Sequence, residues 1–198
     1  MTRSACKRDK LERMTYYGSK ELAASFRTVR NNTITIAEEI PEDKYDFRAS
    51  PETRSVAQTL VHMAIVGRLP QQIHFVEART DLNGFDFMTF FGGLIADEQK
   101  PRNKAEIIEL LKTSGEKMAS LFEGCSDEFL GQIVTFPEGM TPPTKTRFEM
   151  LLGVKEHEMH HRGQLMVLQR MIGITPHLTR QMMARIESMQ AMSAAQKG

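Results

Sequence analysis

The chain has 198 residues, enough for one sizeable hydrophobic core, and we expect a single domain over residues 1–198. Its 26 basic and 25 acidic residues leave a formal charge of +1, which excludes the strong positive field that draws in nucleic acid or an anionic membrane. Two cysteines, Cys6 and Cys125, make no disulfide framework, and no apolar run approaches the roughly 18 residues of a membrane span. These features indicate a protein of the reducing cytoplasm.

Residues 1–15 mix basic and polar side chains with few apolar ones, and they predict a weakly docked leader. A helix is expected from Ser19 to the stop at Pro41, because apolar residues recur there at steps of three and four. This stripe consists of Leu22, Phe26, Val29, Thr33, Ile36 and Ile40. Segment 41–51 begins and ends with proline, and we expect a short irregular connection.

A second helix is predicted over about 53–78, with His62 on its inward face and an expected kink at Pro70. The inward position of His62 follows from the helical spacing of the apolar residues after it, which are Ile65, Val66, Leu69 and Ile73. Residues 81–103 predict a long loop that either crosses the bundle or covers a site, since so long a connection in a compact domain is seldom idle.

A third helix is predicted over 104–122, followed by a loop over 123–145 that contains a short strand near 132–136. The fourth long helix covers 147–173, and a last amphipathic segment covers 178–192. Every apolar pattern of useful length has a period close to 3.6 residues. The predicted fold class is therefore all-α, a four-helix bundle with an additional C-terminal helix.

The fourth helix carries two histidines on a stripe that otherwise holds core residues, namely Met150, Val154, His157, His161, Leu165, Leu168 and Ile172. Because positions i and i+4 stack on a helix, His157 and His161 can hold one divalent ion if a third ligand comes from elsewhere. His62 faces inward and supplies that third ligand. We predict a metal site that uses the Nε2 atoms of these histidines; the alternative is a set of core histidines bonded to backbone or carboxylate.

The other three histidines of the chain are expected outside this site. His160 points about 100° away from the stripe, and His74 and His177 lie at helix ends. Two polar neighbours, Gln164 and Glu158, could orient a ligand or a bound water, with the alternative that each is a polar flank of the helix.

Residues 157–161 also match H-E-x-x-H, in which Glu158 would activate the water of a zinc peptidase. The extended form of that motif needs a glycine and a third histidine where Gln164 and Val167 stand, and the carboxylate variants have only Glu187 as a downstream ligand. A peptidase also presents an edge strand to its substrate, and strand signals are almost absent here. We therefore disfavour the peptidase hypothesis.

The segment VAQTLVHMA around His62, the segment HEMHHRGQL from His157 onward and the following RMIGITP resemble the DinB family of metal-dependent four-helix proteins. The resemblance covers the chain from the first helix through Pro176. It implies a metal triad at His62, His157 and His161, a bundle with unusual connectivity and a frequent homodimer. It also implies relatives that transfer or isomerise groups with low-molecular-weight thiols.

The leading functional hypothesis is a divalent-metal-dependent enzyme for a small-molecule substrate, with Zn²⁺ or Ni²⁺ favoured over Fe²⁺ or Mn²⁺. Its reaction would be thiol-dependent S-transfer or a hydrolase-type reaction. The alternative is a non-catalytic, metal-stabilised dimeric stress-response or binding module. A fourth protein ligand would favour the module, whereas a ligand-sized cavity at the metal would favour the enzyme. A homodimer is also expected from the methionine-rich C-terminal segment.

Overall fold

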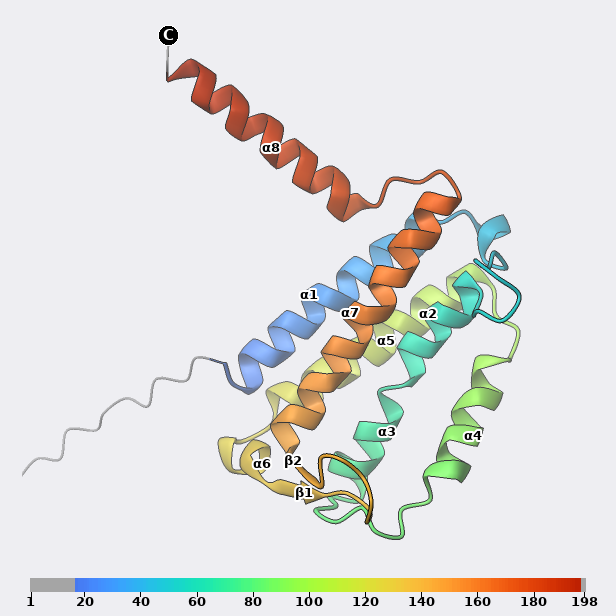
Figure 1. Cartoon of the computed structure of the whole chain (residues 1–198), viewed down its shortest axis with the longest axis vertical. Helices are drawn as coiled ribbons and strands as arrows, with labels where there is room; N and C mark the ends of the chain where they lie inside the picture. Colours follow the sequence, from blue (N-terminus) through green and yellow to red (C-terminus); the bar gives the residue numbers. More distant parts are fainter. Residues whose placement is uncertain (1–16, 197–198) are drawn as a thin grey trace, which may run out of the picture.

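The computed structural model describes residues 17–196, so the predicted leader over 1–15 lies outside the described residues. Four long helices form a bundle and a fifth follows it: α1 (Ser19–Glu39), α2 (Val56–Ile65), α5 (Lys104–Glu123), α7 (Arg147–Met171) and α8 (His177–Ala195) (Figure 1). The predicted all-α class, a four-helix bundle with an additional C-terminal helix, is confirmed.

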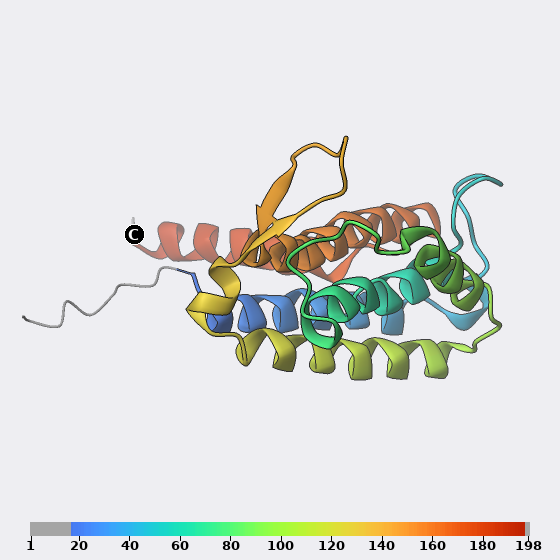
Figure 2. The same ribbon diagram turned by 90° about the horizontal axis from the view of Figure 1, so that it is seen from below.

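In this bundle the first two helices, α1 and α2, are not adjacent, whereas the next pair along the chain, α2 and α5, pack together. Helix α1 packs against α5 and α7, and α2 packs against the same two helices. Helices α1 and α2 therefore lie at opposite corners of the bundle (Figure 2), which differs from the up-and-down order with short loops between adjacent helices. This arrangement places the face of α2 that carries His62 against α7.

The starts of the bundle helices are set by side chains that cap them. Ser55 accepts a hydrogen bond from the backbone N–H of Gln58 at 3.2 Å, and the Gln58 side chain accepts from the Ser55 N–H at 3.0 Å. The same reciprocal box joins Thr146 and Glu149 at the start of α7. Because these caps satisfy N–H groups that the helix leaves free, α2 and α7 begin at defined residues.

The helix predicted over 53–78 is interrupted. After α2 the chain forms α3 (Arg68–Gln71) and a π-helical turn, η2 (Gln72–Val76). The break lies at Val66, one turn before Pro70. Pro70 has no N–H to donate to the Val66 carbonyl, and its ring would collide with that carbonyl in a regular helix. The predicted kink at Pro70 thus becomes a division into three pieces.

The loop predicted over 81–103 is wrong in its central part, where the structure has helix α4 (Phe87–Glu98). The Asp86 carboxylate caps it by accepting from the Thr89 N–H at 2.9 Å. Within α4 only Glu98 is buried, so the helix has no buried apolar stripe from which periodicity could be detected. It packs against α2 and brings Glu98 to that helix.

The connection predicted over 123–145 contains a short helix and a two-stranded hairpin: α6 (Asp127–Gly131), β1 (Ile133–Thr135) and β2 (Thr144–Thr146). The strands are antiparallel, with Ile133 opposite Thr146. The predicted strand near 132–136 agrees with β1. Thr146 ends the hairpin and caps α7, so the hairpin leads directly into the helix with the paired histidines.

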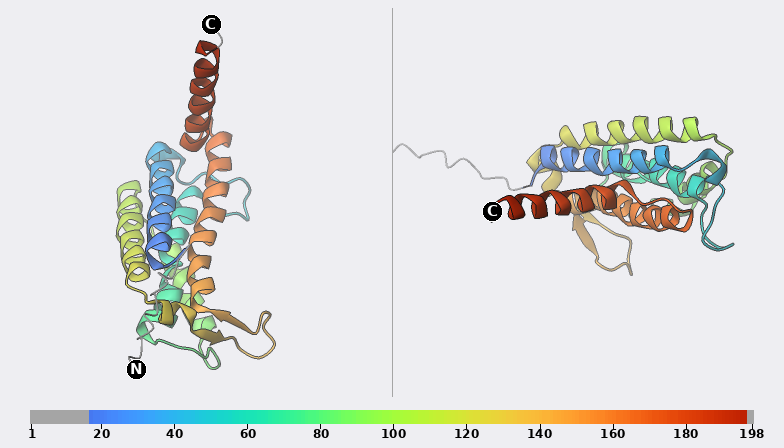
Figure 3. Two further views of the ribbon diagram at one scale, coloured as in Figure 1. Left: turned by 90° about the vertical axis from the view of Figure 1, so that its left-hand side faces the viewer. Right: turned by 90° about the horizontal axis from the view of Figure 1, so that it is seen from above.

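Helix α8 extends beyond the end of the bundle (Figure 3). Of its residues only His177 is buried. Across residues 17–196 no helix is both long and apolar enough to span a membrane.

Candidate metal centre

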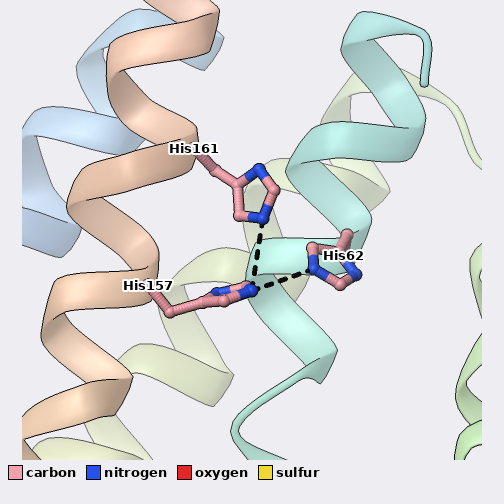
Figure 4. Close-up of side chains that lie close together, drawn as sticks. All are labelled: His62, His157 and His161. Atoms are coloured by element: carbon pink, nitrogen blue, oxygen red, sulfur yellow. Dashed lines mark hydrogen bonds between the residues drawn. The ribbon is translucent and has the colours of Figure 1, made fainter. Parts of the chain in front are cut away.

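The predicted histidines come together between α2 and α7. His157 and His161 lie one turn apart on α7, and His62 faces them from α2 (Figure 4). One ring nitrogen from each residue lies within 4.8 Å of those from the other two. The His157 Nε2 atom is 3.2 Å from His62 Nε2 and 3.2 Å from His161 Nε2. The Nε2 atoms of the three histidines therefore converge.

The outer nitrogens of two rings are held by polar side chains. His62 Nδ1 lies 3.2 Å from Glu98 Oε2, and the other Glu98 oxygen accepts from Arg54 Nε at 2.7 Å. His161 Nδ1 lies 2.7 Å from Gln164 Oε1. Both partners of the imidazoles are acceptors, so each Nδ1 carries the proton and each Nε2 presents a lone pair.

This arrangement leaves the centre of the cluster short of hydrogen-bond donors. The Nε2 lone pairs of His62 and His161 both face His157, whose ring carries a single proton when neutral. His157 Nδ1 is buried and has no hydrogen-bond partner in the described part of the chain. Lone pairs that converge without enough protons to separate them suit a cation.

The spacing also suits a transition-metal ion. With metal–nitrogen distances of about 2.0–2.1 Å, two ligands of a tetrahedral site lie roughly 3.3 Å apart. The two 3.2 Å separations to His157 Nε2 are close to that value. The residues present could thus hold a divalent ion by three nitrogens.

The cluster is uncharged at neutral pH. Burial first, and then the charge of Arg54, lower the pKa of His62 to about 4. Burial, followed by the two neighbouring imidazoles, lowers the pKa of His157 to about 4. Burial also lowers the pKa of His161, although its bond to Gln164 opposes that shift. Neutral imidazole is the form that binds metals, so no proton has to leave before an ion binds.

Glu158, the residue that a zinc peptidase would need, faces away from the triad. Its oxygens accept from Arg30 Nε at 2.8 Å and from Arg30 Nη2 at 2.8 Å. The Arg30 side chain is 6% exposed and the Glu158 side chain is 3% exposed. A carboxylate held in a buried ion pair with α1 cannot serve as the base at the metal, which removes the main support for the peptidase hypothesis.

The three remaining histidines lie outside the cluster. His160 is exposed, and its Nε2 accepts from the Gln164 amide at 3.1 Å. His74 is fully buried in η2, where it contacts Arg147, and His177 contacts Asn32 at the start of α8. Of the two polar neighbours considered from sequence, Gln164 bonds a ring of the triad and Glu158 does not.

Two cavities reach the triad from different sides. The larger one, here the polar cavity, has a volume of about 790 Å³, within the roughly 300–1,000 Å³ typical of small-molecule sites. Its lining includes Arg48, Arg54, Gln58, Gln99, His161 and Gln164. A smaller cavity of about 240 Å³, here the apolar pocket, lies on the side of His157.

Glu98 is the site residue that sequence reasoning missed. The sequence pattern predicts a loop at this position, and a loop leaves the direction of the Glu98 side chain undefined. Two signals could have located it: Asp86 is a good N-cap, and the twelve residues that follow contain no proline. Their glycine and phenylalanine content gave no amphipathic pattern that pointed to a helix.

Comparison with known proteins gives a consistent result. YjoA of Bacillus subtilis, an uncharacterized protein, is 24% identical over 157 residues, which are 79% of this chain and 92% of YjoA. Its crystal structure superposes with a TM-score of 0.57 at 22% identity, covering 78% of this chain and 94% of YjoA. YfiT of the same organism gives a TM-score of 0.63 at 16% identity over 83% of this chain and 93% of YfiT.

YfiT has been described as a probable metal-dependent hydrolase with an unusual four-helix bundle topology. At these identities the structural likeness establishes the shared fold. The model of the DinB superfamily matches residues 25–165, which include α2, most of α7 and all three clustered histidines. Since this match covers well over half of the chain, the protein belongs to the DinB superfamily.

Proposed function

We propose that the protein is a divalent-metal-dependent enzyme whose ion is held by His62, His157 and His161 through their Nε2 atoms. The observation that carries this proposal is the convergence of three Nε2 atoms with two of the rings fixed from behind. Zn²⁺ and Ni²⁺ suit three imidazoles best, and Fe²⁺ and Mn²⁺ are further candidates.

The surrounding residues have defined tasks in this proposal. Glu98 holds the proton of His62 on Nδ1, and Arg54 keeps that carboxylate in place. Gln164 does the same for His161. When bound, such an ion lowers the pKa of a water or thiol so that a nucleophile exists at neutral pH. The polar cavity is lined by Arg48 and Arg54 and also by Glu52 and Glu98, so its charges balance and it suits a polar small molecule.

The reaction we favour is thiol-dependent S-transfer or hydrolysis of a small molecule in the cytoplasm. Its support is the DinB membership, together with the description of YfiT as a probable metal-dependent hydrolase. We propose no nucleic-acid or membrane partner, because a formal charge of +1 gives the protein no basic field that would attract either one.

The alternative, a non-catalytic metal-stabilised module, is less well supported. Among residues 17–196 the group of candidate ligands comprises these three histidines and no fourth side chain. A cavity of about 790 Å³ also reaches His161. A closed structural site would have four protein ligands and no such access.

The experiment that tests the proposal measures metal first and turnover second. Protein purified without a histidine tag is supplied with Zn²⁺, Ni²⁺, Fe²⁺ or Mn²⁺ and dialysed, and the metal per chain is determined. We expect one ion per chain in the wild type and in His160→Ala, and little in His161→Ala. The loaded protein is then screened for thiol transfer and ester or amide hydrolysis. Metal retention by His161→Ala would refute the ligand assignment, and a loaded protein inactive in both screens would favour the module.

We also propose a homodimer that forms through α8. Five large apolar side chains of this helix are between 46% and 69% exposed: Met182, Met183, Ile186, Met189 and Met192. Apolar surface of this extent on a projecting helix favours association with a second copy (Figure 3). Light scattering should give the mass of two chains for the wild type and of one chain for Ile186→Glu. A monomeric wild type would remove the proposal.

A further inference from the structure

The apolar pocket lies between η2, the β1–β2 hairpin and α7, on the His157 side of the triad. Most of its wall is apolar, with Val66, Leu69, Ile73, Phe136, Met150 and Val154. The polar side chains in the wall are His74, Lys145 and His157. An engineered apolar cavity of about 150 Å³ holds benzene in another protein, so a pocket of about 240 Å³ has room for one ring with a short substituent.

His74 presents a hydrogen-bond donor that no described residue uses. The side chain is 0% exposed, and its Nδ1 lies 2.9 Å from Arg147 Nη1. A guanidinium only donates, so Nδ1 of His74 is the acceptor and the ring proton is on Nε2. That Nε2 atom is buried and has no partner among residues 17–196. A buried donor without a partner costs free energy, which a ligand oxygen would recover.

Positive charge lies next to His74. Arg147 is 1% exposed, and its three bonded acceptors are His74 Nδ1, Gln132 Oε1 and the Ala78 carbonyl, all neutral. No carboxylate within 4.0 Å balances it in the described part of the chain. Lys145, a second cation, lines the pocket itself. A buried cation without a carboxylate partner, together with Lys145 in the pocket wall, favours an anionic ligand group.

We infer that the apolar pocket is the substrate subsite for a compact apolar carboxylic acid, whose carboxylate is bound by His74 Nε2–H and Lys145 and whose body lies against the apolar wall beside His157. This assignment rests on the proposed function, since it supplies the substrate class for the reaction at the triad. Burial, and then Arg147, lower the pKa of His74 to about 4, so the ring stays neutral and keeps Nε2–H as its donor at physiological pH.

Two substitutions test the pocket, one by filling it and one by removing its buried donor. An added Cβ at Gly153, which lines the pocket, meets no atom within 4 Å, so the side chain of Gly153→Leu can start there and should occupy the pocket. Gly163 on the same helix is exposed and equally unobstructed, which makes Gly163→Leu the matched control. His74→Asn keeps an acceptor for Arg147, because Asn Oδ1 replaces His Nδ1, and leaves no donor at the position of Nε2.

The test measures binding of 3-phenylpropionate and of 3-phenylpropanol, which lacks the carboxylate, to the full chain by ligand-observed NMR. Both metal-free and metal-loaded protein are used. We expect the Kd for the acid to rise about tenfold or more in His74→Asn while the Kd for the alcohol stays unchanged. Gly153→Leu should abolish binding of both probes, and Gly163→Leu should bind like the wild type.

The subsite is refuted if the wild type does not bind the acid, if Gly153→Leu binds it like the wild type, or if His74→Asn weakens both probes equally. Its failure can be distinguished from failure of the metal proposal. Binding of the acid to metal-free protein, lost in Gly153→Leu, would support the pocket even if no ion binds. Conversely, one ion per chain without binding of the acid would leave the metal site and remove the subsite.

Discussion

His157 and Glu158 are neighbours on α7, yet they belong to polar clusters of opposite construction. Around Glu158 the donors and acceptors are matched: Arg30 also donates to the Leu111 carbonyl at 2.9 Å, to Ser114 Oγ at 3.0 Å and to the Met63 carbonyl at 3.1 Å. Around His157 the acceptors outnumber the donors, and its Nδ1 has no partner among residues 17–196.

The difference distinguishes a structural cluster from a candidate metal site. A buried ion pair whose hydrogen bonds are all satisfied holds helices together, and removing one partner leaves an uncompensated charge. A cluster that lacks protons at its centre is completed by something the chain does not contain. Burial alone would not distinguish them, since Glu158 and His161 are both buried.

The largest effect is expected for Glu158→Gln. It leaves the Arg30 charge buried without its counter-ion, so the free energy of unfolding should fall by about 3–5 kcal/mol. Urea unfolding of the metal-free protein measures the loss, and Glu156→Gln, an exposed carboxylate on the same helix, is the control. A loss no greater than that of the control would show that the pair does not hold α1 to α7.

Glu98→Ala should act on the other cluster. It removes the acceptor that fixes the His62 ring, so metal affinity should weaken about 10–100-fold. Competition with a chromophoric chelator measures the Kd. Asp97→Ala removes the neighbouring carboxylate, which pairs with Arg68 and Arg102, and should leave the Kd unchanged. Equal effects of the two variants would contradict an orienting role for Glu98.

Gly115→Ala tests how closely α5 packs against the buried Arg30 side chain. A Cβ at this position would lie 2.6 Å from Arg30 Cγ, so the buried Arg30 must shift. Overpacking should cost about 1–3 kcal/mol, offset by up to about 1 kcal/mol from helix propensity. Gly163→Ala meets no atom within 4 Å and should stabilise the protein. Thermal unfolding that ranks Gly115→Ala at or above Gly163→Ala would refute the close approach.

The last prediction concerns pH. The folded-state pKa of His74 is about 4, below the ordinary 6.5, so the unfolded chain binds a proton that the folded chain does not. Its contribution to stability is complete above pH 6.5 and is lost as the pH falls toward 4. With chelator present, His74→Asn should make this decline shallower by up to about 1.4 kcal/mol per pH unit. An unchanged slope in urea unfolding between pH 6.5 and 5 would contradict it.

The sequence predicted the features that depend on local periodicity. The stripe with His157 and His161 and the inward position of His62 follow from the 3.6-residue repeat, and the structure brings their nitrogens within 4.8 Å. The Nε2 orientation followed from side-chain reach alone.

The positions of the polar residues around this cluster are set by long-range packing, which the sequence pattern does not show. Glu98 belongs to a helix with no buried apolar stripe, so the sequence pattern predicts a loop there and does not indicate where the Glu98 side chain points. Arg30 and Glu158 are 128 residues apart, and nothing local in either segment indicates that they pair. The unpaired His74 donor could likewise be recognised only after Arg147 was placed beside it.

The most direct test of the central claim is anomalous diffraction from crystals of the full chain grown with Zn²⁺. We expect one peak per chain between α2 and α7, about 2.0–2.1 Å from Nε2 of His62, His157 and His161. The Nδ1 atoms of His62 and His161 should remain on Glu98 and Gln164. A peak bound through Nδ1 or through the Glu98 carboxylate, or no peak at the three histidines, would contradict the claim.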